Sequence, residues 1–161
     1  TRRRRPDVAP FSDNLSDGLA ALTGQRKSDA AILREIGDQD PQMRELVAAA
    51  MGAQQELGPA FDVAVYRAAL AYDFGQLEIP FESNVPVQVR YRGTLLDTGH
   101  TADFICFGDT LVSVHAQDAF TTDDNRVFIS QLNALDMARG LLLNFSVAPL
   151  DFRRAARALD T

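Results

Sequence analysis

The sequence feature that most constrains the fold of this chain is the segment Gly99–Phe120, which has a turn signal near its centre. Two runs rich in β-branched and aromatic residues, Thr101–Phe107 and Thr110–Gln117, flank a Gly-Asp pair at positions 108 and 109. Such runs favour strands, and a glycine-containing pair between them favours a tight turn. The segment therefore predicts a β-hairpin around which the rest of the chain folds.

The side chains of this hairpin define the first candidate site. Successive side chains of a strand point to opposite faces, so Asp103 shares a face with Ile105 and Phe107, away from Ala102, Phe104 and Cys106. On the second strand, Leu111, Ser113, His115 and Gln117 share one face, away from Val112, Val114 and Ala116. If Asp103 faces the same way as Ser113 and His115, a small polar cluster lies in an otherwise apolar sheet.

Periodic apolar residues predict helices on both sides of the hairpin in the sequence. Leu46, Val47, Ala50, Met51 and Leu57 recur at helical spacing from Gln42 until Gly58-Pro59, and a further helix is expected from Ala60 to about Phe74. Earlier, a short helix is expected after Asn14 or Ser16, and another from Ser28 or Asp29 to Gly37, with Pro41 beginning the next element. Thr121 or Thr122 is expected to cap a later helix that includes Val127, Phe128, Leu132, Leu135 and Met137.

Three more segments have the composition of strands or of a chain end. Val85–Arg92 predicts a strand with Pro86 at its start, and the apolar run Gly140–Phe145 predicts a strand buried on both faces. The tail Leu150–Leu159 predicts a last strand or helix. Together these elements predict an α/β fold, with a mixed central sheet flanked by helices.

The first forty residues differ in character from the rest. Arg2, Arg3, Arg4 and Arg5 form a basic run, and Pro6 and Pro10 follow it. This run reads either as an arm that docks on a partner or as a solvated tail. Leu15, Leu19 and Leu22 would lie on one face of the short helix that follows, and we expect them, with the basic run, to bind a protein partner.

The charge and cysteine content narrow the classes of function. The formal net charge of −6 disfavours general nucleic-acid binding, because contacts with phosphate need lysine and arginine. Cys106 is the one cysteine, so an internal disulfide is excluded and a reducing, cytoplasmic location is expected. No apolar run is long enough for a membrane span, and no signal peptide is visible.

Several stretches of the sequence resemble the GxxExxY proteins, small members of the PD-(D/E)xK nuclease superfamily. They are LGPAFDVAVYRAALAYDF, IPFESNVPVQVRYRG, TADF and GLLLNFSV, in the order found in that family. The similarity covers roughly residues 44–152. It implies a restriction-endonuclease-like core in residues 44–161, preceded by an extension of residues 1–43.

The family's site joins a helix Glu, a strand Asp and a Glu-x-Lys pair on the next strand. The carboxylates hold Mg²⁺, which polarises phosphate and activates water, and the Lys adds positive charge. By the resemblance, the family's helix Glu falls on Val63, while its signature Tyr is retained as Tyr66 and its signature Gly falls on Ala60. The strand Asp is retained as Asp103.

The remaining family positions carry different chemistry in this chain. Ser113 stands where the family has the strand Glu, and His115 stands where it has the Lys, while a family Gln on the later helix falls on Val127. One carboxylate remains where the metal would take at least two. The resemblance therefore implies a vestigial site, no catalytic residue and no cofactor.

Other ways to rebuild the site are weaker. Asp62 is about 100° around the helix from Val63, and Asp118 faces the other way if its strand continues. Asp103 with His115 suits a transition-metal site, but the simpler interpretation is that Ser113 and His115 hydrogen-bond to Asp103. Cys106 is expected to be a buried small hydrophobe that faces away from Asp103, and His100 a surface residue.

Three hypotheses follow from the sequence. The favoured one is a non-catalytic, nuclease-like domain that serves as a binding or structural subunit of a larger protein assembly. The second is a divergent nuclease that uses Mg²⁺ and acts on DNA or RNA. The third is a non-catalytic nucleic-acid binder that uses the basic run together with Arg90, Arg92, Arg153, Arg154 and Arg157.

Overall fold

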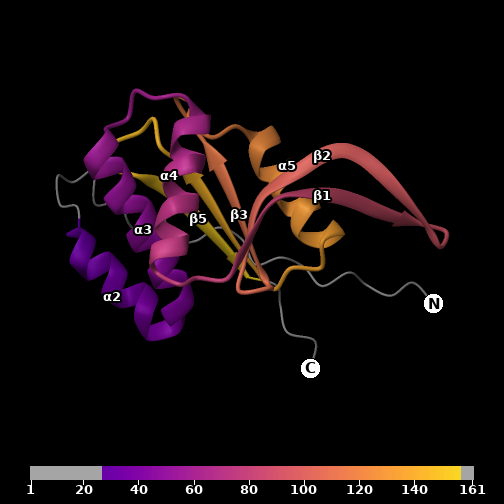
Figure 1. Cartoon of the computed structure of the whole chain (residues 1–161), viewed down its shortest axis with the longest axis horizontal. Helices are drawn as coiled ribbons and strands as arrows, with labels where there is room; N and C mark the ends of the chain where they lie inside the picture. The colour runs from indigo at the N-terminus through magenta and orange to yellow at the C-terminus, as the bar shows by residue number, and fades with distance from the viewer. Residues whose placement is uncertain (1–26, 157–161) are drawn as a thin grey trace.

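The computed structural model of the chain describes residues 27–156, and the predictions for the basic run at 2–5 and for the leucines at 15, 19 and 22 lie outside the described residues. Figure 1 shows one sheet with helices on both of its faces. The helices of the described range are α2 (Asp29–Gln39), α3 (Pro41–Leu57), α4 (Val63–Gln76) and α5 (Thr122–Ala134). The strands are β1 (Phe81–Tyr91), β2 (Thr94–Cys106), β3 (Thr110–His115), β4 (Arg139–Asn144) and β5 (Asp151–Ala156).

The five strands form one mixed sheet in the order β1-β2-β3-β4-β5. All neighbouring strands are antiparallel except β3 and β4, which are parallel and are joined through α5. This arrangement confirms the predicted α/β fold with a mixed central sheet flanked by helices. It also shows that the tail continues as a strand, because β5 pairs with β4 along its whole length.

The core is divided by the sheet into two apolar clusters. Alternate residues of β4 show the division, because Leu141 and Leu143 pack with α2, α3 and α4, whereas Leu142 packs with α5. Residues 140–145, which are the five residues of β4 after Arg139 and the following Phe145, are all buried, as the continuous apolar run predicts. Gly140 is needed at its start, since a Cβ atom there would lie 2.5 Å from the ring of Phe128.

Helix starts agree with the sequence better than helix ends. Ser28 caps α2, Asp40 and Pro41 begin α3, and Thr121 caps α5 through a capping box with Asp124. Gly37, however, does not end α2, which continues to Gln39. Its lack of a side chain makes room for Arg44, whose Cδ would lie 2.7 Å from an added Cβ.

The helix expected from Ala60 begins later, at Val63. Gly58 has a φ of 79° and ends α3, and Asp62 is the residue that precedes the first turn of α4. The prediction was therefore right about the break and wrong about the next start. Ile32 and Ile36 of α2 lie in the same core cluster as α3 and α4, so α2 packs on the sheet domain. The predicted domain boundary at residue 43 stays a prediction.

The first strand is longer than predicted, and Pro86 lies inside it rather than at its start. β1 is an edge strand, and an edge tolerates a residue without an N–H donor. The pairing of β1 with β2 shifts by two residues beyond Pro86, where Thr98, Gly99 and His100 bulge outward opposite Val87. The Thr98 hydroxyl donates to the carbonyl of Val87 over 2.8 Å and holds this bulge.

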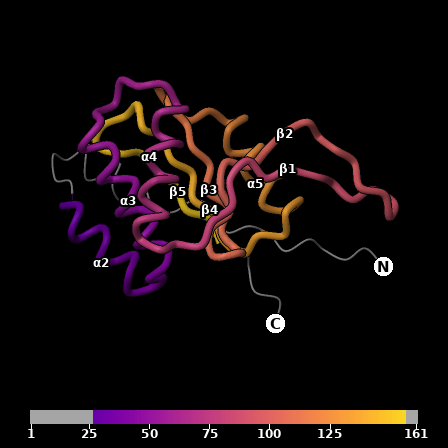
Figure 2. Tube along the Cα trace, in the orientation of Figure 1, coloured from indigo at the N-terminus to yellow at the C-terminus, as the bar shows by residue number. Residues whose placement is uncertain are grey.

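The central hairpin of the prediction is confirmed, with its turn one residue earlier. β2 and β3 are antiparallel, and Phe107 and Gly108, with φ values of 57° and 73°, form the middle of the turn. β2 also begins well before the predicted strand, at Thr94, and forms a second hairpin with β1 that extends away from α2, α3 and α4 in Figure 2. None of the helices within residues 27–156 combines the length and apolar character needed to cross a membrane.

Candidate functional site

Asp103 lies where β2 and β3 separate. The ladder between these strands includes Phe104 and Val112, and one residue further along Asp103 bonds through its side chain instead. Its Oδ2 accepts a hydrogen bond of 2.8 Å from the backbone N–H of Val114. The carboxylate thus takes the place of a backbone acceptor for β3.

The other carboxylate oxygen of Asp103 faces a cation from α4. Arg67 Nε lies 2.9 Å from Oδ1, and the arginine side chain is 42% exposed while that of the aspartate is 14% exposed. The Nε–H has no acceptor at hydrogen-bond geometry, so this contact is an ion pair rather than an aligned hydrogen bond. A guanidinium therefore stands directly beside the carboxylate that the sequence resemblance aligns with the strand Asp of the nucleases.

Ser113 and His115 lie on one face of β3, as alternation predicts, and bond to each other. The Ser113 Oγ and His115 Nε2 atoms are 3.1 Å apart. The imidazole also meets the ring of Phe120 edge to face, with 5.9 Å between centroids. Neither side chain is bonded to Asp103, so the predicted hydrogen bonds from this pair to the aspartate are wrong.

The physical reason is a change of face along β2. Ala102 packs in the cluster beneath α5, whereas Phe104, two residues later, packs in the cluster beneath α3 and α4. Simple alternation would place both on one face. The change occurs at Asp103, opposite Asn84 of β1, whose φ is 53°. This turns the carboxylate toward α4 and away from the polar face of β3.

Val63 and Tyr66, the two α4 residues that the sequence resemblance assigns to a vestigial site, have structural contacts. Val63 is partly buried and packs against the first core cluster. Tyr66 is fully buried, stacks on Phe145 with 4.5 Å between ring centroids, and donates its hydroxyl proton to the carbonyl of Gly58. Its hydroxyl oxygen also accepts from the N–H of Phe61 over 3.2 Å. Tyr66 thereby fixes the turn between α3 and α4.

Sequence reasoning missed Arg67. A signal was present, because Arg67 follows Val63 by four residues, and positions i and i+4 lie on the same helix face. Val63, which the resemblance aligns with the family's helix Glu, and Arg67 are therefore adjacent on the surface of α4. What the sequence lacks is the tertiary contact that brings this face of α4 to Asp103.

The other residues considered from the sequence as possible members of the site do not lie beside Asp103. Cys106 is fully buried in the first core cluster, and burial raises the pKa of its thiol to about 12. His100 is exposed in the bulge of β2, and Asp62 and Asp118 are exposed in loops. Val127 is 48% exposed on α5. None of these residues adds a ligand beside Asp103.

A second cluster of polar side chains lies where β3 and β4 end and α5 begins. Asn144 exchanges hydrogen bonds with the backbone of Gln117, and the Gln117 amide donates to Asp124. Partial burial opposes ionisation of Asp124, but hydrogen bonds from Thr121 and Gln117 outweigh it and lower the pKa of this carboxyl. These bonds join the chain after β3 to the first turn of α5.

The donor set does not fit Mg²⁺. This ion prefers oxygen ligands in octahedral geometry and is usually held through one or two free carboxylates. The carboxylate of Asp103 is already shared between a backbone N–H and a guanidinium, and Ser113 and His115 are bonded to each other. Within residues 27–156, no group of three or more His, Cys, Asp or Glu side chains converges on one point.

Comparison with known proteins gives one match. A family model described as the PD-(D/E)XK nuclease superfamily matches residues 40–155, which is more than half of the chain. No curated protein and no solved structure matches the chain. The matched region begins at the residue that caps α3 and ends within β5.

Proposed function

This chain belongs to the PD-(D/E)XK nuclease superfamily, and we propose that it keeps the nuclease fold as a non-catalytic binding or structural subunit of a larger protein assembly. Within the superfamily, the stretches around Tyr66, Val85 and Gly140 favour the GxxExxY proteins as its family. The single cysteine favours a reducing compartment, such as the cytoplasm.

The observation that carries the proposal is the pair formed by Arg67 and Asp103. A metal-dependent nuclease needs a carboxylate whose oxygens are free to bind the ion, and an arginine side chain remains charged at every accessible pH. With the guanidinium nitrogen 2.9 Å from Oδ1, a divalent cation at this position would meet strong like-charge repulsion. The pair replaces the metal's positive charge by a fixed protein charge.

We predict the surface that binds the partner from the sequence alone. Arg2 to Arg5 and the leucines at 15, 19 and 22 are the residues that we propose to contact the partner. They lie outside the superfamily match, which begins at residue 40. A segment of this kind, added before a core that has lost its ligands, is where a new binding role would arise.

The alternative is a divergent nuclease, and the retained Asp103 is the observation that favours it. In this case the guanidinium of Arg67 would have to leave the carboxylate when metal and substrate bind. Its 42% exposure means that such a movement would not disturb the core. The two functions therefore differ in one measurable property, which is the affinity of the Asp103 carboxylate for a divalent cation.

The test uses the purified full chain with linear duplex DNA, single-stranded DNA and RNA, in the presence of Mg²⁺ or Mn²⁺. We expect no cleavage of any of these substrates. Cleavage that is lost in Asp103→Asn and retained in Asp118→Asn would overturn the proposal. Asp118 is a matched control because it is an exposed aspartate in the loop after β3.

A stability measurement provides a readout that does not depend on choosing the right substrate. A ligand that binds only the folded state at a hundred times its Kd raises the free energy of unfolding by about 2.7 kcal/mol. We expect the free energy of unfolding of the wild type, measured with urea, to be the same with and without Mg²⁺ or Mn²⁺. The same should hold for Asp103→Asn. A metal-dependent rise in the wild type alone would favour the nuclease.

A further inference from the structure

The outer part of the β1–β2 hairpin, which we call the arm (residues 88–98), is a two-stranded ribbon that packs on nothing else in the described part of the chain. Every residue from 88 to 101 is exposed, whereas Val87, just before it, is 3% exposed. Figure 1 shows the arm extending beyond the rest of the sheet, on the side away from α2, α3 and α4. An isolated two-stranded hairpin is marginally stable in water.

The arm is unusually apolar for such an exposed element. The pairs Val89–Leu96 and Tyr91–Thr94 lie on one face, and Leu95 lies on the other, opposite Arg90. Tyr91, Leu95 and Leu96 are 54%, 53% and 47% exposed. Single apolar side chains on a surface are ordinary, but a contiguous group marks an interaction site.

The charges of the arm are mostly positive, in a chain whose net charge is −6. Arg90 and Arg92 lie beside the apolar residues, and Asp97 is the one acidic residue in the same stretch. Neither arginine forms an ion pair within the described residues, although Arg92 lies over the ring of Tyr91 at 5.1 Å. The arm therefore offers two unpaired cations with an apolar centre.

A surface of opposite charge lies on the outer side of α4, and we call it the acidic face. Its exposed apolar side chains are Phe61, Val65, Tyr72 and Leu77, and its acidic residues are Glu56, Asp62, Asp73 and Glu78. Partial burial raises the pKa of Asp73, and the neighbouring Glu56 raises it further. None of the four acids forms an ion pair within the described residues, and Arg67 of the same helix is paired with Asp103.

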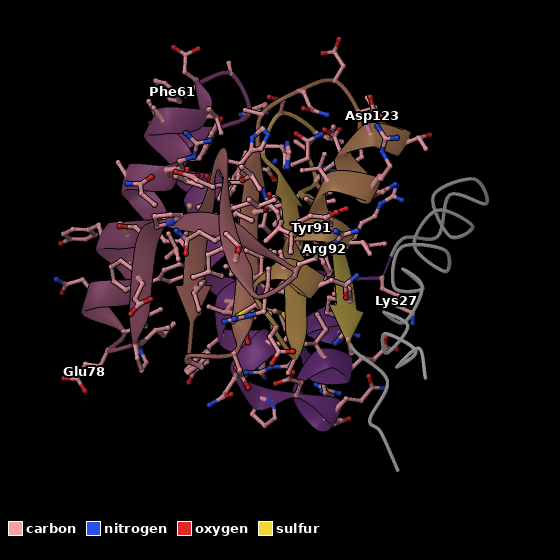
Figure 3. The ribbon with its side chains drawn as sticks, turned by 90° about the vertical axis from the view of Figure 1, so that its right-hand side faces the viewer. Lys27, Phe61, Glu78, Tyr91, Arg92 and Asp123 are labelled. Atoms are coloured by element: carbon pink, nitrogen blue, oxygen red, sulfur yellow. The ribbon has the colours of Figure 1, made fainter. Side chains whose placement is uncertain are left out.

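The two surfaces are complementary in charge and in apolar content, and they are far apart in one molecule. In Figure 3, Tyr91 and Arg92 lie over the centre of the view, while Phe61 and Glu78 lie at the edge formed by α4. The arm of one molecule therefore cannot cover the acidic face of the same molecule. We propose that the arm of one copy of this chain docks on the acidic face of a second copy.

The contact is heterologous, because it joins two different surfaces. Repetition of such a contact generates a ring when the rotation closes and an open filament when it does not. The order of the subunits is set by the cations of Arg90 and Arg92 against Asp73 and Glu78, and the apolar residues supply the buried area. This self-association is independent of whether the fold cleaves nucleic acid.

The test measures self-association of the full chain by sedimentation velocity, from about 1 to about 100 μM, at low and high salt. We expect species larger than the monomer, in an amount that falls as salt rises. Two charge reversals separate the surfaces: an arm variant, Arg90→Glu with Arg92→Glu, and a face variant, Asp73→Lys with Glu78→Lys. We expect at least a tenfold loss of association in each variant alone.

The decisive result comes from mixing the two variants. The unaltered acidic face of the arm variant still fits the unaltered arm of the face variant, so we expect the mixture to associate. Arg126→Glu, which reverses an exposed charge on α5 outside both surfaces, is the matched control and should associate like the wild type. Circular dichroism checks that each variant is folded, as expected because the arm residues lie outside both core clusters.

Two outcomes would overturn the proposal. The first is a wild type that remains monomeric over the whole concentration range. The second is a mixture of the two variants that associates no better than either variant alone. If a monomeric wild type also binds labelled single-stranded DNA through Arg90 and Arg92, the arm is assigned to nucleic acid instead.

Discussion

Asp103 holds the junction between β2, β3 and α4 together. It supplies an acceptor to the N–H of Val114, a residue that is 3% exposed, and a negative charge to Arg67. A buried N–H group without an acceptor costs more than the average hydrogen bond contributes, because its desolvation is no longer offset. This one carboxylate therefore has a structural use that is sufficient to explain its position.

Replacement of Asp103 distinguishes this structural use from that of a ligand. We expect Asp103→Ala to lower the free energy of unfolding by about 1–3 kcal/mol, because the Val114 N–H loses its acceptor. Asp103→Asn keeps an acceptor oxygen and should recover part of this loss. Urea unfolding of the three proteins measures the effect, and an alanine variant as stable as the wild type would contradict it.

At the scale of elements, the start of α5 is fixed by a capping box. Thr121 accepts from the N–H of Asp124, and the Asp124 carboxylate accepts from the N–H of Thr121 over 2.8 Å. Gln117 adds a further bond to this carboxylate, which connects the loop after β3 to the helix. Because β4 follows α5, this cap also helps to place that buried strand.

The cap makes the stability of the protein depend on pH. Because the folded-state pKa of Asp124 is lowered, its contribution is present above the pKa of the unfolded chain, about 3.9, and is lost as the pH falls through the folded value. We expect Asp124→Asn to be less stable than the wild type at neutral pH, with a difference that shrinks below about pH 4.

Urea unfolding across this pH range measures the difference. Asp118→Asn, an exposed aspartate in the loop before α5, is the control and should track the wild type. A difference between Asp124→Asn and the wild type that stays constant down to the lowest pH would show that the carboxylate charge plays no part in the cap.

At the scale of the whole molecule, Arg139 joins parts of the chain that are distant in sequence. Its guanidinium bonds to both oxygens of Asp40, at 2.6 and 2.8 Å, and to Asp109 at 2.7 Å. Asp40 lies between α2 and α3, Asp109 follows the turn of the central hairpin, and Arg139 begins β4. The arginine side chain is 17% exposed, so these bonds are only partly screened by water.

Loss of this junction is expected to loosen the N-terminal helices first. We expect Arg139→Ala to lower the free energy of unfolding by about 1–3 kcal/mol, because two carboxylates lose their partner. Arg139→Lys retains the charge but not the bidentate geometry, so its stability should lie between those of the wild type and Arg139→Ala. Hydrogen exchange of α2 amides should accelerate in Arg139→Ala more than that of β4 amides. Arg126→Ala, which removes an exposed pair, should change stability by less than about 0.5 kcal/mol. Equal effects of Arg126→Ala and Arg139→Ala would refute the role of the junction.

The sequence by itself determined the features that depend on neighbouring residues. The caps at Ser28 and Thr121, the start of α3 at Pro41, the buried run of β4 and the hairpin of β2 and β3 follow from local bonding and from the alternation of side chains. These local patterns predicted the α/β class. The stretches of sequence that resemble the GxxExxY proteins predicted the superfamily to which the chain belongs.

Only the tertiary structure decided which groups meet. Arg67 reaches Asp103 because α4 packs over the point where β2 changes face, and no local pattern encodes that contact. Pro86 fits inside β1 because the strand lies at an edge, and α2 continues past Gly37 to Gln39. The hairpin of β2 and β3 lies within the sheet, as predicted, but the positive charge beside Asp103 comes from Arg67 of α4. Ion pairs form wherever packing brings opposite charges together, so they depend on the tertiary structure.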